Sequence, residues 1–229
     1  MIIGGLQKVS LSDFPGKIAA IVFTRGCNFR CPYCHNPELV DPEKYAPPLE
    51  EKAVLAFLRS RIGMIQGVVV SGGEPTLHDD LPPFLANLKT MGFHVKLDTN
   101  GSRPGMLETV LSQGCVDYVA LDIKGPLSAY GRITRTSVDL AVIRQSTRLV
   151  IDSGLPHEMR TTYLASLLSE SEMTEVAEMI RGCHAFFLQA FHATKLLDPA
   201  LGREPAPDRA ALERLLKAFR DRGIPAQVR

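Results

Sequence analysis

Residues 18–37 read IAAIVFTRGCNFRCPYCHNP, an apolar run followed at once by three cysteines. The run from Ile18 to Thr24 is short and ends in a polar turn, which is typical of a buried β-strand. Similar short runs bounded by glycine, proline or polar residues recur along the chain. Segments with apolar residues at helical spacing separate them. The sequence therefore predicts an alternation of strands and helices.

Six strand and helix pairs are predicted from this alternation. The strands are expected at residues 18–24, 67–71, 93–98, 118–122, 158–164 and 185–191. The helices are expected at residues 49–62, 81–91, 106–112, 138–152, 172–181 and 208–222. Parallel neighbouring strands need a helix-length return, so this rhythm predicts an α/β fold with a parallel sheet. Six units fall short of eight, which leaves two architectures open: an incomplete barrel, or an open doubly wound sheet.

Composition places the chain among ordinary globular proteins. Hydrophobic residues make up 45% and charged residues 22% of 229 residues, which excludes intrinsic disorder. The formal net charge is +1, so no overall field favours nucleic acid or an anionic membrane as a partner. The sequence shows no secretory signal and no apolar stretch of about 18 residues. We therefore expect a cytoplasmic protein that binds neither nucleic acid nor membrane.

Five cysteines are too few for a disulfide scaffold, and an odd number cannot all pair within one molecule. A reducing compartment fits this count best. Two of the five, Cys115 and Cys183, have no cysteine nearby in the sequence. We expect them to be buried as small hydrophobic side chains.

The other three cysteines, Cys27, Cys31 and Cys34, fall within eight residues directly after the first predicted strand. Thiolates are soft ligands that suit zinc, copper(I) or iron–sulfur clusters. A structural zinc site usually draws two ligand pairs from two separate turns, and no second pair is present. His35 could complete a Cys3His set, although it would have to strain to reach the same ion as its neighbour Cys34. Zinc is therefore disfavoured but stays open.

A four-iron, four-sulfur cluster normally takes four thiolates, whereas only three are arranged here to reach one cluster. One iron would keep an open position. An open position on a metal is where a substrate or cofactor coordinates. The spacing of the three cysteines therefore favours chemistry over a purely structural role.

The CxxxCxxC pattern, with Tyr33 before its last cysteine, resembles the signature of the radical S-adenosylmethionine enzymes. A longer stretch, GGLQKVSLSDFPGKIAAIVFTRGCNFRCPYCHNPEL, resembles the opening of glycyl-radical-enzyme activating proteins. The resemblance is strongest to the branch named for activation of anaerobic ribonucleoside-triphosphate reductase, and it extends to about Leu197. The expected fold is then an α/β incomplete parallel (β/α)6 barrel, open on one side. We expect one domain over residues 1–229, with its core at about 17–195 and the helix at about 208–222 covering the barrel.

The resemblance implies a [4Fe-4S] cluster on the three cysteines and S-adenosylmethionine as the second cofactor. It matches the SGGEPT segment to the amino group of that cofactor, Asp122 and Lys124 to its methionine moiety, and His192 to its ribose. Asp98 and Thr99 would help to bind a monovalent cation. The full set of expected cofactor contacts is Tyr33, Gly72, Gly73, Glu74, Asp98, Asn100, Asp122, Lys124, Arg160 and His192.

Each of these motifs also has a plainer structural explanation. The two glycines of SGGEPT can form an anion-binding nest or only a turn. The acidic residues after the third and fourth strands can satisfy backbone donors at a strand-to-helix turn. Arg160, expected to point inward, needs an anion, either a carboxylate of the substrate or cofactor or an internal Asp or Glu. The cysteine loop, SGGEPT, DTNG, DIKG and His192 all follow the carboxyl ends of different strands, where parallel α/β folds place their sites. That shared position favours function.

The activity implied by the resemblance is reductive cleavage of S-adenosylmethionine to a 5′-deoxyadenosyl radical, which installs a glycyl radical on a partner enzyme. The expected partner is an anaerobic ribonucleotide reductase, and the expected electron donor is flavodoxin or ferredoxin. Two alternatives remain. One is a radical S-adenosylmethionine enzyme that acts on a small molecule, similar to 7-carboxy-7-deazaguanine synthase. The other is a zinc-binding interaction module with no catalytic activity.

Overall fold

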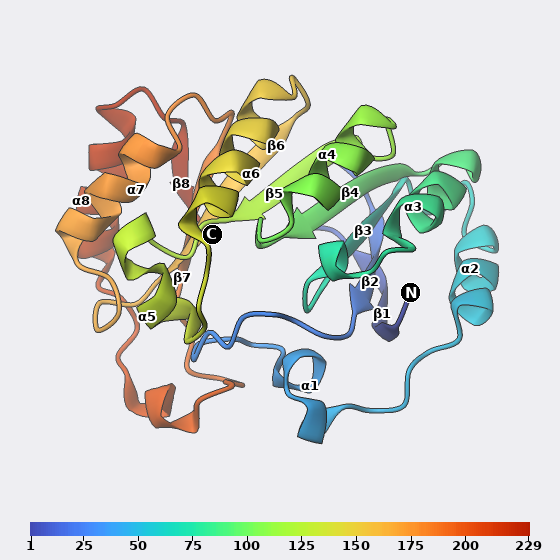
Figure 1. Cartoon of the computed structure of the whole chain (residues 1–229), viewed down its shortest axis with the longest axis horizontal. Helices are drawn as coiled ribbons and strands as arrows, with labels where there is room; N and C mark the ends of the chain where they lie inside the picture. The colour runs from blue at the N-terminus through green and yellow to red at the C-terminus, as the bar shows by residue number, and fades with distance from the viewer. The chain divides into compact units, whose positions relative to one another are not determined.

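The computed structural model describes all 229 residues and alternates strands with helices along the chain (Figure 1). The eight strands follow one another in the sheet in chain order, β1 to β8, and the sheet is not closed. The chain packs into two compact units. Unit 1 comprises Met1–Asn28, Glu38–Thr99 and Gly105–Val119. Unit 2 comprises Phe29–Pro37, Asn100–Pro104 and Ala120–Arg229.

Unit 1 is built on four strands. They are β1 (Ile3–Ser10), β2 (Ala19–Thr24), β3 (Gly67–Gly72) and β4 (His94–Thr99). β1 pairs antiparallel with β2, whereas β2, β3 and β4 pair in parallel. The apolar runs of β2 and β3 are typical of strands covered on both faces. Their polar residues gather at the carboxyl ends.

The helices of unit 1 are α1 (Pro37–Val40, whose first residue belongs to unit 2), α2 (Glu51–Arg59), α3 (Leu81–Thr90) and α4 (Pro104–Ser112, likewise beginning in unit 2). Two short 3-10 turns, η1 (Pro42–Lys44) and η2 (Pro75–Leu77), lie between them. In η2, the side chain of Glu74 caps the turn by accepting from the backbone of Thr76. The turn therefore begins shortly after the two glycines at the end of β3.

Unit 2 contains the rest of the sheet. Strand β5 (Tyr118–Asp122) begins in unit 1 and ends in unit 2, followed by β6 (His157–Tyr163), β7 (Phe186–Ala190) and β8 (Ala226–Val228). The last three pair in parallel. The helical segments are η3 (Leu127–Ala129), α5 (Tyr130–Thr134), α6 (Leu140–Asp152), α7 (Glu170–Met179), η4 (Pro199–Arg203) and α8 (Arg209–Arg220).

The last helix, α8, buries one apolar face in unit 2. Its buried residues are Leu212, Leu215, Leu216 and Phe219. The ring of Phe219 stacks on Phe186 of β7, with the two ring centroids 4.2 Å apart. α7 lies beside α8 (Figure 1) and begins with a capping box between Ser169 and Glu172. The apolar spacing in residues 208–222 thus correctly indicated a helix with one buried face.

The predicted α/β class with parallel strands in an unclosed sheet is confirmed, and each of the six predicted strands is present to within a residue or two. Two strands go beyond the prediction. β1 carries Gly4 and Gly5 near its start, where a Cβ at Gly4 would lie 2.5 Å from the side chain of Leu39. β8 has only three residues. Neither segment has the apolar run by which the other strands were recognised.

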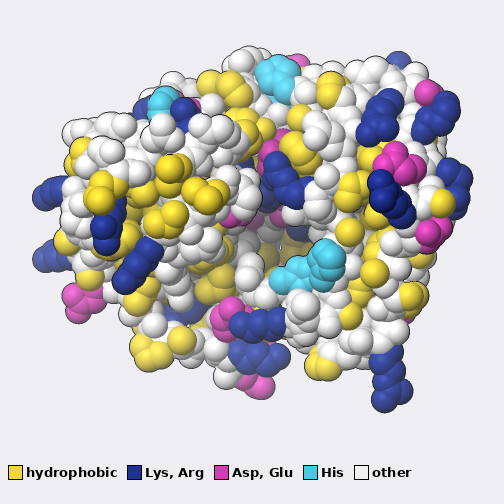
Figure 2. All heavy atoms as spheres, turned by 180° about the vertical axis from the view of Figure 1, so that it is seen from behind, with side chains coloured by type: hydrophobic (Ala, Val, Ile, Leu, Met, Phe, Trp, Pro, Cys, Tyr) yellow, Lys and Arg dark blue, Asp and Glu magenta, His cyan; other side chains and the backbone are white.

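Charged side chains of both signs are interspersed on the face shown in Figure 2, in keeping with the net charge of +1. Both cysteines outside the CxxxCxxC motif, Cys115 and Cys183, are buried as predicted, with 4% and 5% exposed. No helix combines the length and the apolar character needed to cross a membrane.

A buried histidine in unit 2 has both ring nitrogens in hydrogen bonds that fix the neutral form. Nδ1 of His157 donates to the carbonyl of Leu155 at 2.8 Å, and Nε2 accepts from the backbone N–H of His184 at 3.1 Å. The ring also stacks on that of His184, with centroids 4.1 Å apart. Burial lowers the pKa of His157 below its ordinary value, and a charged ring could not accept the second bond.

We expect the free energy of unfolding to decrease as the pH falls below about 6.5, the ordinary pKa of histidine. The unfolded chain then binds a proton that the folded ring does not, at a cost of up to about 1.4 kcal/mol per pH unit. His157→Gln should flatten this slope in urea unfolding. The matched control, His94→Gln at an exposed position, should keep it. An equal slope in both variants would contradict the assignment.

Candidate functional site

The Gly-Gly turn at the end of β3 packs directly on the chain that leads to the first cysteine. Gly73 donates its backbone N–H to the carbonyl of Thr24 at 2.9 Å, and Glu74 donates to the carbonyl of Gly26 at 2.8 Å. A Cβ on Gly73 would lie 2.0 Å from the Gly26 oxygen, and Gly72 has φ +120°. Both glycines are therefore required by backbone packing. This packing fixes the residue immediately before Cys27.

The same hydrogen bonds change the interpretation of the SGGEPT segment. An anion-binding nest needs successive backbone N–H groups that point at the ligand. The N–H groups of Gly73 and Glu74 are instead used inside unit 1. The backbone groups that such a turn can still offer a ligand are carbonyl oxygens, which accept hydrogen bonds and suit an ammonium group.

The carboxylate of Glu74 organises the turn from within. Its side chain is 1% exposed, and Oε1 accepts from the backbone N–H of Thr76 at 3.0 Å and from the hydroxyl of Thr99 at 2.7 Å. Glu74 therefore links η2 to the end of β4. These hydrogen bonds indicate that Glu74 holds the SGGEPT turn in place, so its effect on a ligand at that turn would be indirect.

At the end of β4 a buried lysine accompanies the predicted acidic residue. Nζ of Lys96 lies 2.9 Å from Oδ1 of Asp98, and the hydroxyl of Ser71 donates to Oδ2 at 3.1 Å. Lys96 is 1% exposed. Its ammonium group places a positive charge beside Asp98, where the resemblance implied a monovalent cation. Lys96 was not among the predicted site residues, although two residues apart on a strand means the same face.

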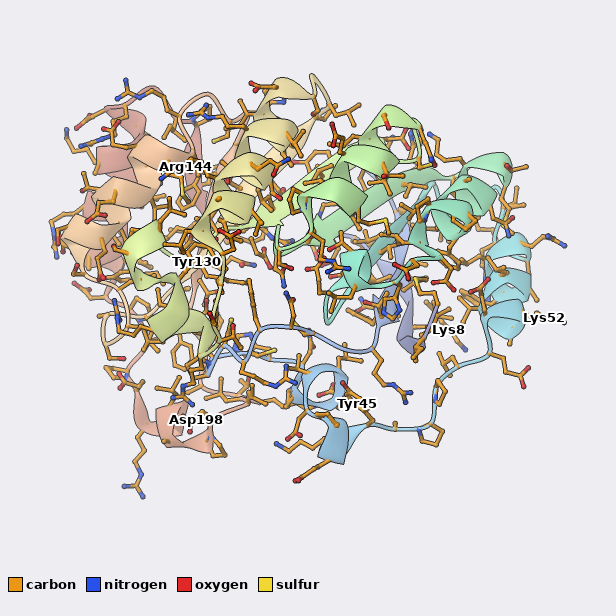
Figure 3. All side chains as sticks on the ribbon, in the orientation of Figure 1. Lys8, Tyr45, Lys52, Tyr130, Arg144 and Asp198 are labelled. Atoms are coloured by element: carbon orange, nitrogen blue, oxygen red, sulfur yellow. The ribbon has the colours of Figure 1, made fainter.

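In unit 2, the turn that carries Cys31 and Cys34 is held by the segment after β7. Cys34 donates its N–H to the carbonyl of Cys31 at 3.0 Å, which closes the turn. The carbonyl of Cys34 accepts from Leu197 at 3.0 Å, and that of Pro32 accepts from Asp198 at 2.9 Å. Asp198 is labelled in Figure 3. The conformation of the two-cysteine turn therefore depends on a segment that is distant in the sequence.

The Cys31 thiol is buried in surroundings that disfavour its ionisation. Burial raises the pKa of Cys31 to about 11, and the nearby Lys124 only partly opposes this. At neutral pH the metal-free thiol is therefore protonated, and a bound metal would have to displace that proton. The hydroxyl of Tyr33 is buried beside this thiol, and its hydrogen bond to Cys31 slightly opposes the rise in the pKa of Cys31.

Asp122, Lys124 and Arg160 form a partly buried group of charged side chains. The Asp122 carboxylate contacts Nε of Arg160 at 2.7 Å and Nζ of Lys124 at 3.1 Å. Burial alone would raise the pKa of Asp122, but Arg160 and Lys124 outweigh it and hold that pKa well below its ordinary value. Asp122, Tyr33 and Cys31 likewise raise the pKa of Lys124 against the effect of burial. The carboxylate and both cations are therefore charged at neutral pH.

Lys124 and Arg160 make further contacts within unit 2. The backbone N–H of Lys124 donates to the hydroxyl of Tyr130 at 3.2 Å, and Figure 3 labels Tyr130 at the start of α5. An internal acidic partner was one of the two alternatives predicted for Arg160, and the structure contains it. Besides the contact with Asp122, Nη1 of Arg160 lies 3.7 Å from Glu158.

Asn100 behaves as a turn residue, since its side chain accepts a hydrogen bond from the backbone N–H of Ser102 at 2.9 Å.

The two histidines near the cysteines interact with each other. Nε2 of His35 donates to the backbone carbonyl of His192 at 3.0 Å, and its ring stacks on Phe191 with centroids 6.4 Å apart. His192 itself is exposed. The position of the His35 ring argues against a Cys3His metal site.

The predicted site residues thus divide between the units. Unit 1 holds Cys27, Gly72, Gly73, Glu74 and Asp98, and unit 2 holds Cys31, Tyr33, Cys34, Asn100, Asp122, Lys124, Arg160 and His192. Within unit 2, Tyr33, Cys31, Asp122 and Lys124 are mutual neighbours. The thiol and carboxylate groups do not form a ready-made set of three metal ligands.

The chain belongs to the Radical SAM superfamily, whose family description matches residues 21–181. The superfamily uses a [4Fe-4S] cluster and S-adenosylmethionine, as predicted. Similarity of fold extends to the crystal structure of Streptococcus suis SuiB bound to S-adenosylmethionine, with a TM-score of 0.67 and 15% identity. That match covers 91% of this chain and 51% of SuiB.

Within the superfamily the chain groups with the glycyl-radical-enzyme activating enzymes. It is 30% identical over 221 residues to a protein of Methanocaldococcus jannaschii named as a candidate glycyl-radical enzyme activating enzyme, covering 94% of this chain and 90% of that one. It is 35% identical over 129 residues to the pyruvate formate-lyase-activating enzyme of Clostridium pasteurianum, covering 53% and 52% of the two chains. The chain is therefore an enzyme of the glycyl-radical-activating type.

The contact between Gly73 and Gly26 can be tested by adding one methyl group. Gly73→Ala forces the backbone before Cys27 to move, and we expect it to destabilise unit 1 by about 1–3 kcal/mol in urea unfolding. It should also lower the iron content after anaerobic reconstitution. The control is Gly105→Ala, where no atom lies within 4 Å of the new Cβ. Wild-type stability and iron content in Gly73→Ala would disprove the contact.

Proposed function

We propose that this enzyme installs a glycyl radical on a partner enzyme. The observation that carries the proposal is the alignment with the Methanocaldococcus jannaschii protein, because it spans nearly the whole of both chains. The name of the Clostridium pasteurianum relative supports the same reaction class. When bound, the two cofactors would supply one-electron cleavage of S-adenosylmethionine into methionine and a 5′-deoxyadenosyl radical, which would take a hydrogen atom from the partner's glycine.

In this proposal the three thiols of Cys27, Cys31 and Cys34 hold the cluster. Three thiolates fit a cluster that needs one open iron. Tyr33 is buried directly beside the Cys31 thiol. His35 takes no part as a ligand, because its ring donates to the carbonyl of His192.

The remaining residues bind and orient S-adenosylmethionine. Carbonyl oxygens of Gly72 and Gly73 would accept from its amino group, and Glu74 would hold that turn in place. The Asp122 and Lys124 pair would bind the methionine moiety, with Arg160 fixing Asp122 at 2.7 Å. His192 would approach the ribose, and Asp98, Asn100 and Tyr33 would also contact the cofactor. The protein groups bind, orient and exclude water.

The partner class is a glycyl-radical enzyme, and we propose an anaerobic ribonucleotide reductase as the first candidate. Pyruvate formate-lyase is an equal candidate, because an activating enzyme of that name is among the relatives. Flavodoxin or ferredoxin would supply the electron. We propose the cytoplasm as the location, since all five cysteines are free thiols.

The ligand assignment predicts that cluster content depends on three specific cysteines. Cys27→Ala, Cys31→Ala and Cys34→Ala should each lose most of the iron and the brown colour after anaerobic reconstitution. The matched controls are Cys115→Ala and Cys183→Ala, which remove buried thiols elsewhere and should retain the iron. Full iron content in all three motif variants would end the assignment. Stoichiometric zinc in colourless wild-type protein would favour the interaction module.

The reaction predicts a radical on another protein. Reduced enzyme, S-adenosylmethionine and a candidate glycyl-radical enzyme should give a glycyl radical signal by electron paramagnetic resonance. Testing both candidate partners side by side would discriminate between them. Cleavage of the cofactor without that signal, for every glycyl-radical enzyme of the source organism, would favour a small-molecule substrate instead.

A further inference from the structure

Two more charged residues, Glu158 and Arg229, extend the charged group of Asp122, Lys124 and Arg160 in unit 2. Glu158 of β6 is fully buried, and its two carboxylate oxygens lie 3.0 and 3.4 Å from the guanidinium of Arg229. Nη1 of Arg160 lies 3.7 Å from the same carboxylate. Positive and negative groups therefore alternate along the row Arg229, Glu158, Arg160, Asp122 and Lys124.

Arg229 is held at its end of the row by both backbone and side chain. Its N–H donates to the carbonyl of Leu188 at 3.0 Å, and its carbonyl accepts from Ala190 at 3.2 Å, which extends the pairing of β8 with β7. The guanidinium also lies 3.8 Å from the ring centroid of Phe187. The side chain is 34% exposed, so it lies where the row reaches solvent.

Arg160, the central arginine of the row, contacts both Asp122 and Glu158. Its close contact is with Asp122 at 2.7 Å, whereas its contact with Glu158 is longer, at 3.7 Å. A fully buried carboxylate needs a cation nearby. Because Arg229 satisfies Glu158, Arg160 is left to Asp122. Without Arg229, Glu158 would draw Arg160 toward itself and away from the carboxylate that Lys124 shares.

We propose that Arg229 is a positioning residue for the cofactor site, which acts by keeping Glu158 from competing with Asp122 for Arg160. The inference rests on the proposed function, in which Asp122 and Lys124 bind S-adenosylmethionine. Arg229 touches neither of them directly. Its effect passes through the ion pairs that Glu158 and Arg160 make along β6.

The test compares a single variant with a double variant that keeps the net charge of the wild type. Arg229→Gln should weaken the binding of S-adenosylmethionine to the cluster-loaded enzyme about tenfold in anaerobic equilibrium dialysis, about 1.4 kcal/mol. The double variant Arg229→Gln with Glu158→Gln removes the competing carboxylate as well. It should return to within about twofold of the wild-type affinity, because a neutral amide in place of the carboxylate makes a far weaker claim on Arg160.

A matched control removes a similar ion pair elsewhere in unit 2. Arg222 contacts Glu178 at 2.8 Å on the surface, and Arg222→Gln should leave the affinity unchanged. Thermal unfolding of all four proteins separates affinity from folding. A structural role for β8 alone would lower the midpoint and the affinity of the single and double variants together.

The outcomes are distinct. Equal affinity in wild type and Arg229→Gln would overturn the inference, and so would a double variant that binds as weakly as the single one. Wild-type protein that carries its cluster and yet binds no S-adenosylmethionine would overturn the proposed function, and this inference with it. Weak binding by Arg229→Gln with recovery in the double variant would support the inference.

Discussion

The charge of one partly buried carboxylate, that of Asp122, constrains the charged group that it forms with Lys124 and Arg160 in unit 2. A lone buried carboxylate would take up a proton, and a neutral acid would no longer hold Lys124 in place. Arg160 and Lys124 prevent this from 2.7 and 3.1 Å. The other acidic neighbour of Arg160, Glu158, is paired with Arg229 at 3.0 Å. The contacts beside Cys31 thus depend on the charges of Glu158 and Arg229, which are distant from Cys31 in the sequence.

In unit 1, backbone packing fixes the conformation of the Gly72–Gly73 turn. Gly72 and Gly73 have no side chains because the chain between Thr24 and Gly26 occupies that space. The N–H groups that a glycine-rich turn usually offers to an anion are used in this contact. Close packing therefore also sets the kind of ligand that this turn can bind. Because its backbone N–H groups bond to the protein, the turn offers a ligand backbone carbonyl oxygens, which only accept hydrogen bonds.

Local patterns were enough to predict most of the fold but only part of the site. Runs such as residues 67–71 and 118–122 are apolar and bounded by turns, so their strands were found. β8 was missed because three residues carry no periodicity, and its pairing comes from β7. Likewise, the cysteine spacing indicated a cluster. Nothing local to Glu158 indicates that it meets Arg229, 71 residues later in the chain.

For Lys96, the sequence was enough to predict which face of the strand it lies on, but not its role as a counterion. A lysine two residues before Asp98 on a buried strand must share its face. Alone it suggests an edge or a solvent-facing position, whereas the buried Asp98 makes it a counterion at 2.9 Å. Both units thus balance an acid at a strand end with a cation from the protein itself. Unlike a metal ion, such a cation is covalently fixed, so the charge balance does not depend on the ions in solution.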